Sequence, residues 1–236
     1  MTNPKIVGLI PARGGSKGIP RKNLAAIHGR PLIDYSIQHA LGSKRIDRVV
    51  VSTDDPEIKA VALASGAEVI DRPADLAEDA TPTLPVLQHA LAQLEQSGWV
   101  PDAVVLLQPT VPYRDTEDSD AAIEMLFSQD ADLVVGVVRT KAPRDWIFQL
   151  HDGRVVFYEQ PDFARTRRQS NVPEYRINGA IYVYKSQVIK QSQNYAWGEK
   201  AYGYIMDERR SLDIDEPFDL QIAERLLSPS DRESKI

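Results

Sequence analysis

The sequence predicts an α/β fold built around a parallel β-sheet. From Lys5 to Val138, short runs rich in Val, Ile and Leu alternate with longer amphipathic stretches, which is the pattern of successive βαβ units. The run Ala103–Leu107 is apolar throughout, as is typical of a central strand that is covered on both faces. The length of 236 residues suits one large domain with a full core.

Strands and helices are expected in regular succession. The first strand is Lys5–Ile10, an apolar run that ends at a proline, and the helix Pro56–Ser65 should begin at Asp55, a good N-cap before a proline. The remaining elements follow from their apolar periodicity. Expected strands are Arg48–Ser52, Glu68–Ile70, Ala103–Leu107 and Leu133–Val138, and expected helices are Pro31–Leu41, Thr83–Gln96 and Thr116–Phe127.

The pattern changes in the second part of the chain. Arg154–Tyr158 and Arg176–Lys185 are expected strands, separated by a polar, Arg-rich stretch without a long helix, so we expect an arm within about residues 140–176. A strand at Tyr202–Met206 and a helix at Pro217–Leu227 restore the earlier rhythm. Residues 1–228 are therefore expected to form a single domain, and the polar residues 229–236 a flexible tail.

Composition excludes several classes of protein. The chain has 28 Lys and Arg against 34 Asp and Glu, a net charge of −6, which argues against a nucleic-acid or other polyanion binder. It has no cysteine, so disulfides, thiolate metal sites and a cysteine nucleophile are excluded. We see no export signal and no apolar run long enough to span a membrane, and we therefore expect a cytoplasmic protein with no membrane partner.

Positive charge is concentrated in the loop after the first strand. Residues 1–30 contain six Lys or Arg and no acidic residue, and the loop Pro11–Asn23 follows the carboxyl end of a strand, where open α/β sheets bind ligands. Glycines at positions 14, 15 and 18 allow backbone N–H groups to turn towards phosphate oxygens. The spacing differs from that of a Walker loop, which argues against that class of nucleoside triphosphatase. A flexible glycine turn with solvated lysines is the simpler alternative.

A pair of carboxylates lies just before the last expected helix. In the extended segment Asp213-Ile214-Asp215, the alternate side chains project to one side, and such an oxygen-only pair suits Mg²⁺. Helix capping by Asp215 or Glu216 before Pro217 is the alternative, and it would account for one of the two carboxylates but not both. The four histidines have no mutual spacing that suggests a metal or catalytic site.

The loop Ile10–Asn23 resembles the hallmark sequence of the acylneuraminate cytidylyltransferases, or CMP-sialic acid synthetases. The resemblance continues in order through Ser52–Asp55, Arg72–Leu76, Leu107–Arg114, Arg168-Gln169, Asn178–Tyr182 and Asp213–Asp215. It implies a Rossmann-like three-layer α/β/α sandwich of the nucleotide-diphospho-sugar transferase type, with a mostly parallel sheet, a small dimerisation arm and a homodimeric state. The implied reaction is attack of the anomeric hydroxyl of a nine-carbon 2-keto sugar acid on the α-phosphate of CTP, which releases pyrophosphate with the assistance of Mg²⁺.

The resemblance also implies roles for individual residues on the nucleotide side. Arg13, Lys17 and Lys22 would hold the triphosphate and Asn23 would orient it, with Arg13 and Lys22 acting in catalysis. Asp213 and Asp215 would bind the metal and act in catalysis. Arg72 and the turn that contains Thr81 and Thr83 would read the cytosine. A surface salt bridge with Asp71 or Asp75 is the simpler alternative for Arg72.

On the sugar side, the implied contacts are Gln108, Asn178 and Tyr182. Taken alone, Asn178-Gly179 predicts a hairpin turn, and Gln108 could be a strand cap. The basic cluster Arg165–Gln169 would lie on the arm and reach towards the partner's active site. One of its arginines, either Arg165 or one of the next two, could pair there with the sugar carboxylate. A solvated face is the usual explanation of such a cluster.

Two other functions fit part of this pattern. Sugar-nucleotide glycosyltransferases share a βα core and an Asp-x-Asp motif, but they usually carry that motif midway along the chain and lack the glycine-rich basic loop. A non-catalytic nucleotide-binding module would have no need of both the loop and the acidic pair. Sialic, legionaminic and pseudaminic acids remain equal candidates for the sugar substrate, because they share the anomeric carboxylate.

Overall fold

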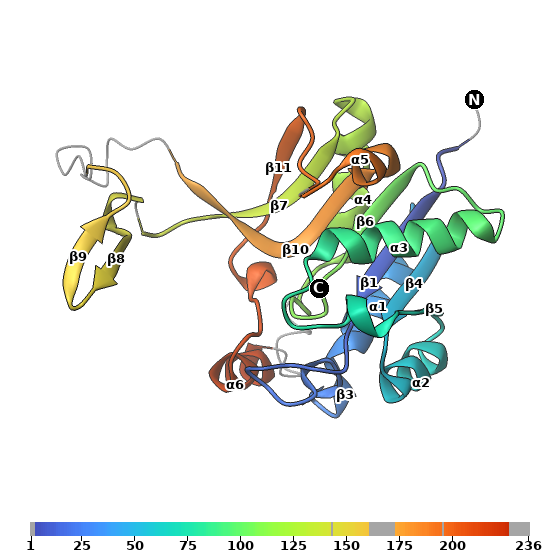
Figure 1. Ribbon diagram of the computed structural model, residues 1–236, viewed down its shortest axis with the longest axis horizontal. Helices are drawn as coiled ribbons and strands as arrows, with labels where there is room; N and C mark the ends of the chain where they lie inside the picture. The colour runs from blue at the N-terminus through green and yellow to red at the C-terminus, as the bar shows by residue number, and fades with distance from the viewer. Residues whose placement is uncertain (1–2, 143, 161–172, 195, 227–236) are drawn as a thin grey trace, which may run out of the picture.

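A seven-stranded sheet forms the centre of the protein in the computed structural model, which describes residues 3–142, 144–160, 173–194 and 196–226. The strand order is β11-β7-β10-β6-β1-β4-β5 (Figure 1). All neighbours pair in parallel except β10, which runs antiparallel to both β6 and β7. The strands are β1 Ile6–Pro11, β4 Arg48–Thr53, β5 Glu68–Asp71, β6 Ala103–Leu106, β7 Leu133–Arg139, β10 Tyr175–Lys185 and β11 Ala201–Ile205.

Helices cover both faces of this sheet, so the expected three-layer sandwich is confirmed. The helices α3 (Thr83–Gln96) and α5 (Ser186–Gln191) lie on one face. The opposite face is covered by α1 (Leu32–Gly42), α2 (Pro56–Ala64) and α4 (Thr116–Ser128). Side chains of β1 divide between the two layers: Ile6 and Ile10 join the core under α1, whereas Val7 and Leu9 join the core under α3. This alternation explains why the strands are apolar throughout.

Most expected elements are confirmed to within two residues. The N-cap at Asp55 is also confirmed, because its carboxylate accepts hydrogen bonds from the N–H groups of Glu57 and Ile58. A third apolar cluster joins the last helix, α6 (Pro217–Leu226), to α1 and to the segment that ends at Ile214. The sequence interpretation missed the short helix α5 and the short strands β2 Ala26–Ile27, β3 Arg30–Pro31 and β8 Phe148–His151, together with the 3-10 turns Lys22–Leu24, Ala74–Leu76, Arg144–Trp146 and Arg209–Ser211.

The hairpin predicted from Asn178-Gly179 alone is wrong. Strand β10 continues through these residues, and its register against β7 shifts between Ile177 and Tyr182. Gly179 adopts a φ of 74°, a left-handed conformation that glycine takes at little cost. The Asn-Gly pair therefore produces a bulge inside a long strand, because both ends of the strand pair with the same neighbour, β7.

A two-stranded unit projects from the end of β7 and β10 (Figure 1). It pairs β8 with β9, Arg154–Phe157, in antiparallel fashion around a turn in which Asp152 and Gly153 both have positive φ. Apolar side chains on this hairpin are exposed, among them Leu150, Val155 and Val156. Among the residues that the structure describes, no helix is both long and apolar enough to cross a membrane.

Candidate functional site

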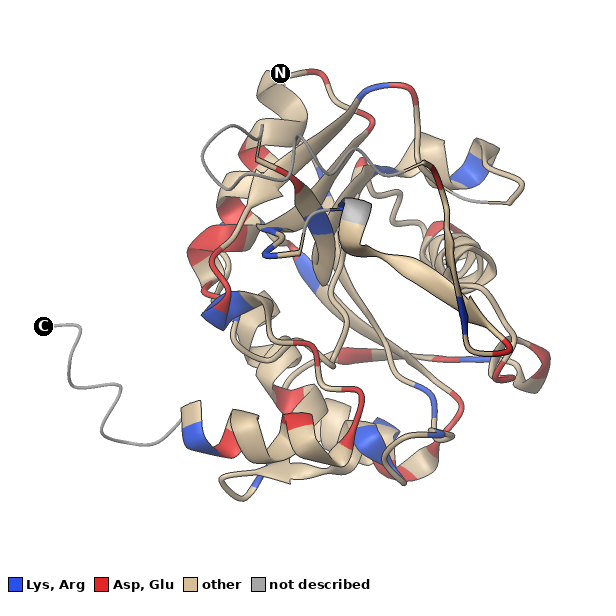
Figure 2. Ribbon diagram, turned by 90° about the vertical axis from the view of Figure 1, so that its left-hand side faces the viewer, with Lys and Arg blue, Asp and Glu red and all other residues tan. Residues whose placement is uncertain are grey.

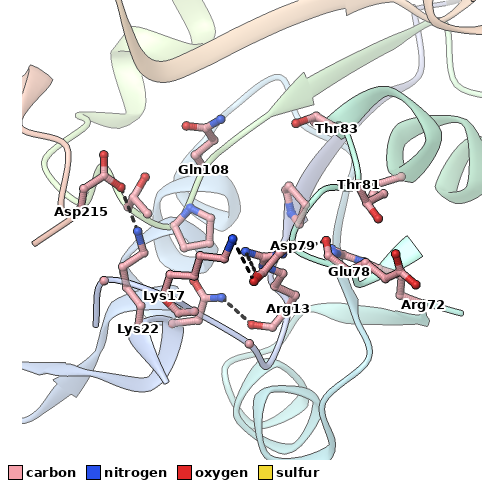
Figure 3. Close-up of a pocket in the computed structure, with 18 of the residues that line it drawn as sticks. Arg13, Lys17, Lys22, Arg72, Glu78, Asp79, Thr81, Thr83, Gln108 and Asp215 are labelled. Atoms are coloured by element: carbon pink, nitrogen blue, oxygen red, sulfur yellow. Dashed lines mark hydrogen bonds and ion pairs between the residues drawn. The ribbon is translucent and has the colours of Figure 1, made fainter. Parts of the chain in front are cut away.

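A cavity of about 720 Å³ opens at the carboxyl ends of β1 and β6 (Figure 3). Its lining comes from four separate parts of the chain: the basic loop, the segment from Arg72 to Val86, the residues after β6, and the acidic segment before α6. The predicted residues in this lining are Arg13, Lys17, Lys22, Asn23, Arg72, Thr81, Thr83, Gln108, Asp213 and Asp215. The fold therefore brings together ten predicted site residues from positions far apart in the sequence.

The basic loop is fixed by contacts at both of its ends. The N–H group of Gly14 donates to Asp54 Oδ1 at 3.0 Å, and a Cβ at Gly14 would lie 2.6 Å from Asp55 Oδ2, so the close approach requires glycine there. Asn23 Nδ2 donates to the carbonyl oxygen of Arg13 at 2.9 Å, which closes the loop on itself. A Cβ at Gly18 would collide with the backbone oxygen of Asp215, and the loop thus packs directly against the acidic segment.

Acidic groups pair with each predicted phosphate-binding cation. Arg13 Nη2 lies 2.7 Å from Asp79 Oδ1, and Lys17 Nζ lies 3.2 Å from Asp79 Oδ2. Arg13 Nη1 also donates to the backbone oxygen of Glu78 at 2.8 Å. Lys22 Nζ pairs with Asp215 Oδ1 at 2.9 Å. The loop therefore meets the rest of the cavity through ion pairs, which Figure 3 shows as dashed lines.

Arg72 is buried at the side of the cavity, with an exposed fraction of 8%. Its Nη2 donates to the backbone oxygen of Ser52 at 2.6 Å and its Nε to the Ser52 hydroxyl at 3.2 Å. Asp71 pairs instead with Lys59 at 2.6 Å, so the predicted alternative of a surface salt bridge for Arg72 is wrong. Burial lowers the pKa of Arg72 to about 10, which leaves the guanidinium charged at neutral pH.

The turn before α3 lies beside Arg72. The Thr81 hydroxyl donates to the backbone oxygen of Asp75 at 3.2 Å, and Thr83 is the first residue of α3. Both threonines line the cavity together with Arg72. Hydroxyl groups, backbone groups and one cation thus surround this side, which is a suitable set for a polar heterocycle.

Gln108 lies at the end of β6, between the main cavity and a smaller cavity of about 150 Å³. Gln108 and Thr83 line both cavities, and Tyr182 lines only the smaller one. Ring stacking with Tyr184, at a centroid separation of 6.2 Å, orients Tyr182. The smaller cavity therefore extends the main one along α3 and β10.

Asn178 lines neither of these two cavities. It is 2% exposed, its Nδ2 donates to the Ser211 hydroxyl at 2.8 Å, and its Oδ1 accepts from the N–H group of Ala180 at 3.0 Å. These bonds stabilise the bulge of β10 next to Gly179, where a Cβ would lie 3.0 Å from Gln108 Oε1. Arg165, the predicted sugar contact on the arm, lies outside the described residues.

The acidic pair faces the cavity from the segment before α6. Burial raises the pKa of Asp213, a hydrogen bond with Thr110 opposes that rise, and the negative charge of Asp215 adds to it. Asp213 Oδ1 is buried and accepts no hydrogen bond from the residues that the structure describes. The N–H groups of Asp215 and Glu216 donate to Asp219 Oδ2, and Asp215 Oδ1 pairs with Lys22. Helix capping by Asp215 or Glu216 stays a prediction.

Sequence reasoning missed two polar residues that shape this site. No local pattern in the sequence marks Asp79, because its partners Arg13 and Lys17 lie more than sixty positions away. Arg114 is 6% exposed, and its Nη1 donates to the backbone oxygens of Gln108 at 2.9 Å and Ala180 at 2.7 Å. Its position at the end of the Leu107–Arg114 segment was the available signal. Burial lowers the pKa of Arg114 to about 9.

Acidic and basic residues are interspersed over the side of the molecule that carries the arm (Figure 2).

The described residues contain no cluster of three or more His, Asp or Glu side chains arranged to hold a metal ion. Asp213 and Asp215 line the cavity together with Glu78, Asp79 and Glu216. A hard cation that also binds substrate phosphates needs few protein ligands, and two carboxylates fit that requirement.

Comparisons with known proteins show the family of this chain. Residues 7–228 match the family described as Cytidylyltransferase. An N-acylneuraminate cytidylyltransferase of Escherichia coli is 34% identical over 93% of this chain and 51% of that protein. A CMP-N,N'-diacetyllegionaminic acid synthase of Legionella pneumophila is 32% identical over 94% of this chain and 96% of that protein. The chain thus spans about half the length of the first relative and nearly all of the second.

Several solved structures share the fold at low sequence identity. One of them is a CMP:2-keto-3-deoxy-manno-octonic acid synthetase complexed with CTP, with a TM-score of 0.75 at 18% identity. The similarity covers 96% of this chain and 99% of that one. The three-layer arrangement around a mostly parallel sheet is therefore a known architecture.

Proposed function

This chain belongs to the cytidylyltransferase family, and on that premise we propose that it transfers a cytidylyl group from CTP to a nonulosonic acid and releases pyrophosphate. The observation that carries the proposal is the shared cavity, which is lined by the basic loop, the Arg72 to Thr83 side, Gln108 and the acidic pair. Each part has a matching group in this reaction: triphosphate, base, sugar and metal. The names of the two relatives support a sialic-type acid as the acceptor class.

The basic loop would bind the triphosphate. Arg13 and Lys22 flank the glycine turn and would balance the charge that develops on the β- and γ-phosphates as the bond to the α-phosphate breaks. Lys17 would add a third charge, and Asn23 would keep the loop closed through its bond to the Arg13 carbonyl. The guanidinium of Arg13 can form two parallel hydrogen bonds to phosphate oxygens.

The Arg72 side would hold the cytosine. Telling cytosine from uracil requires an acceptor for the N4 amino group, which backbone carbonyls or the hydroxyls of Thr81 and Thr83 can provide. Arg72 is held by Ser52 and would present a fixed donor to the carbonyl of the base. A site that hydrogen-bonds one exocyclic group discriminates strongly against a base that lacks it.

The sugar acid would lie near Gln108, with Tyr182 at the neighbouring cavity. In the reaction, the anomeric oxygen forms a bond to the α-phosphorus and the proton of the anomeric hydroxyl passes to solvent. The bond between the α-phosphorus and the bridging oxygen breaks, and pyrophosphate leaves with that electron pair. Gln108 would orient the sugar through its side-chain amide. We expect Asn178 to act by stabilising the bulge beside Gln108, because both of its polar atoms bind protein groups.

Asp213 and Asp215 would hold Mg²⁺. The buried, unpaired Oδ1 of Asp213 and the position of both carboxylates on the cavity wall support this assignment. A bound Mg²⁺ supplies Lewis-acid chemistry, since it neutralises phosphate charge and lowers the pKa of a coordinated hydroxyl. Lys22, which pairs with Asp215, would keep this carboxylate next to the phosphate loop.

We further propose that the protein acts as a homodimer in the cytoplasm. The exposed apolar side chains of the β8-β9 hairpin support a role in contact with a second copy, because such a projecting hairpin buries little of its own apolar surface. The basic cluster Arg165–Gln169 would then complete the sugar site of the partner subunit.

Pyrophosphate release tests this function. The protein is incubated with Mg²⁺, one of CTP, UTP or ATP, and one of the sialic, legionaminic or pseudaminic acids. We expect release that requires CTP, Mg²⁺ and at least one of these acids together. Arg45→Ala provides a control, because Arg45 is an exposed arginine paired with Glu124 at 2.9 Å outside the cavity lining. The absence of release with every acid, from folded protein at high substrate concentrations, would contradict the proposal.

A further inference from the structure

Asp79 forms ion pairs with two of the cationic side chains that would bind the triphosphate, Arg13 and Lys17. Its two carboxylate oxygens divide between two side chains, with Oδ1 at 2.7 Å from Arg13 Nη2 and Oδ2 at 3.2 Å from Lys17 Nζ. The side chain of Asp79 lines the main cavity and is 46% exposed. Figure 3 shows this carboxylate lying between the basic loop and the segment that leads to Thr81.

The same short turn satisfies both terminal nitrogens of Arg13. The backbone oxygen of Glu78 accepts from Arg13 Nη1 at 2.8 Å, while Asp79 pairs with Nη2. Arg13 therefore presents its fork of donors to residues 78 and 79 as it would present them to a phosphate. Carboxylates and phosphates are both recognised by this bidentate geometry, and they compete for it.

A phosphate group and the Asp79 carboxylate cannot both occupy this position favourably. Two like charges bound to the same cations repel each other, so the arrival of a triphosphate at Arg13 and Lys17 requires Asp79 to leave. The pairs are partly exposed, with 28% exposure for the Arg13 side chain and 77% for that of Lys17. Exposed ion pairs are weak, and the exchange is therefore accessible in both directions.

We propose that Asp79 is an internal competitor of the nucleotide phosphates. When the site is empty, the Asp79 carboxylate neutralises Arg13 and Lys17. The incoming triphosphate displaces it, and the two ion pairs form again as pyrophosphate leaves. The inference rests on the proposed function for the identity of the anion. Its consequence is that the wild-type protein binds CTP and pyrophosphate less tightly than its cations alone would allow, which favours release of the product.

Removal of the carboxylate tests this role. Asp79→Asn keeps the size of the side chain and removes its charge, so the dissociation constants of CTP and of inorganic pyrophosphate should both fall by about two- to tenfold. Asp79→Glu keeps the charge and should stay close to wild type. Calorimetry with pyrophosphate alone, in the absence of any sugar acid, measures the effect directly. Circular dichroism verifies that each variant is folded.

Glu124→Gln is the matched control, because it removes one negative charge from an exposed side chain that pairs with Arg45 outside the cavity lining. We expect unchanged affinities for this variant. Equal or weaker binding of pyrophosphate and CTP by folded Asp79→Asn would overturn the inference. The proposed function can fail separately. If Asp79→Asn binds pyrophosphate more tightly but the wild-type protein transfers cytidylyl to none of the acids, the transferase activity is refuted and the competitor role stands.

Discussion

At the scale of single residues, Arg13 and Lys22 lie on the two sides of the glycine turn, and both would bind the triphosphate. Arg13 is tied to Asp79 and the Glu78 carbonyl, and Lys22 to Asp215. Each partner is an acid or a carbonyl on another segment, so both cations are held at the cavity wall before any ligand arrives. Once a triphosphate has displaced Asp79, phosphate oxygens would take its place at Arg13, and the positive charge would then lie where negative charge develops in the reaction.

We expect Arg13→Ala and Lys22→Ala to lower turnover by about ten- to a few hundredfold, since each removes a charge-assisted contact that is worth about 1.5–3 kcal/mol. The melting temperature should stay close to that of wild type, because both side chains lie at the cavity surface. Steady-state rates at saturating CTP measure the effect. Turnover of Arg13→Ala near the wild-type value would remove the loop from the mechanism.

The acidic pair gives a second prediction at this scale. Asp213→Asn and Asp215→Asn should each reduce turnover strongly and shift the Mg²⁺ dependence to higher concentrations, because a neutral amide is a poor ligand for Mg²⁺. Glu124→Gln is the control, since that side chain pairs with Arg45 outside the cavity lining. Wild-type rates with wild-type Mg²⁺ dependence in both variants would leave the pair with a structural role.

At the scale of elements, helix α2 shows how one side chain stabilises both a helix and the binding loop. Asp55 accepts from the N–H groups of Glu57 and Ile58 and pairs with Arg21 at 3.0 Å. Burial alone would raise the pKa of Asp55, but these hydrogen bonds and the charge of Arg21 lower it on balance. The ionised form is therefore favoured in the folded state.

We expect Asp55→Ala to lower the free energy of unfolding by about 1–2 kcal/mol at pH 7. The pKa of Asp55 is depressed on folding, so its stabilising effect is present above the unfolded pKa of about 4 and is lost as the pH falls through the folded value. The difference between wild type and variant should therefore shrink in urea unfolding at low pH. A difference that stays constant from pH 7 to below pH 3 would contradict this account.

The sequence allowed prediction of these elements because each rests on local chemistry. The cap at Asp55, the apolar run at Ala103–Leu107 and the glycine-rich loop each depend on residues that are close together in the sequence. The bulge at Gly179 could not be foreseen, because it depends on β7 pairing with both ends of β10. The pairing of Asp79 with Arg13 likewise joins distant segments, and only the folded chain brings them together.

Residue roles that came from the resemblance had mixed support from geometry. All of the residues predicted on the nucleotide side line one cavity, because the carboxyl ends of neighbouring parallel strands meet at one edge of a sheet. Asn178 is buried in hydrogen bonds with Ser211 and Ala180, so an amide that a motif suggests as a ligand contact is bound to the protein. Whether a side chain is buried depends on the whole fold, and a short sequence motif does not show it.

At the scale of the whole molecule, the β8-β9 hairpin predicts an oligomer. We expect a dimer by analytical ultracentrifugation, and Leu150→Asp should weaken it, because Leu150 is an exposed apolar side chain of the hairpin, 66% accessible. Leu63→Asp is the control, an exposed leucine of α2 with 54% accessibility. A monomer that remains fully active at nanomolar concentration would contradict the proposed composite site.

The central claim is that the anomeric oxygen of the sugar acid attacks the α-phosphate of CTP in this cavity. The most direct test uses a sugar acid that supports pyrophosphate release, labelled with ¹⁸O at the anomeric hydroxyl, and determines the masses of both products. We predict a CMP-sugar that retains the label in its bridging oxygen, together with unlabelled pyrophosphate. A CMP-sugar with an unlabelled bridging oxygen, formed while the remaining acid keeps its label, would contradict this mechanism, and so would a product that contains no CMP.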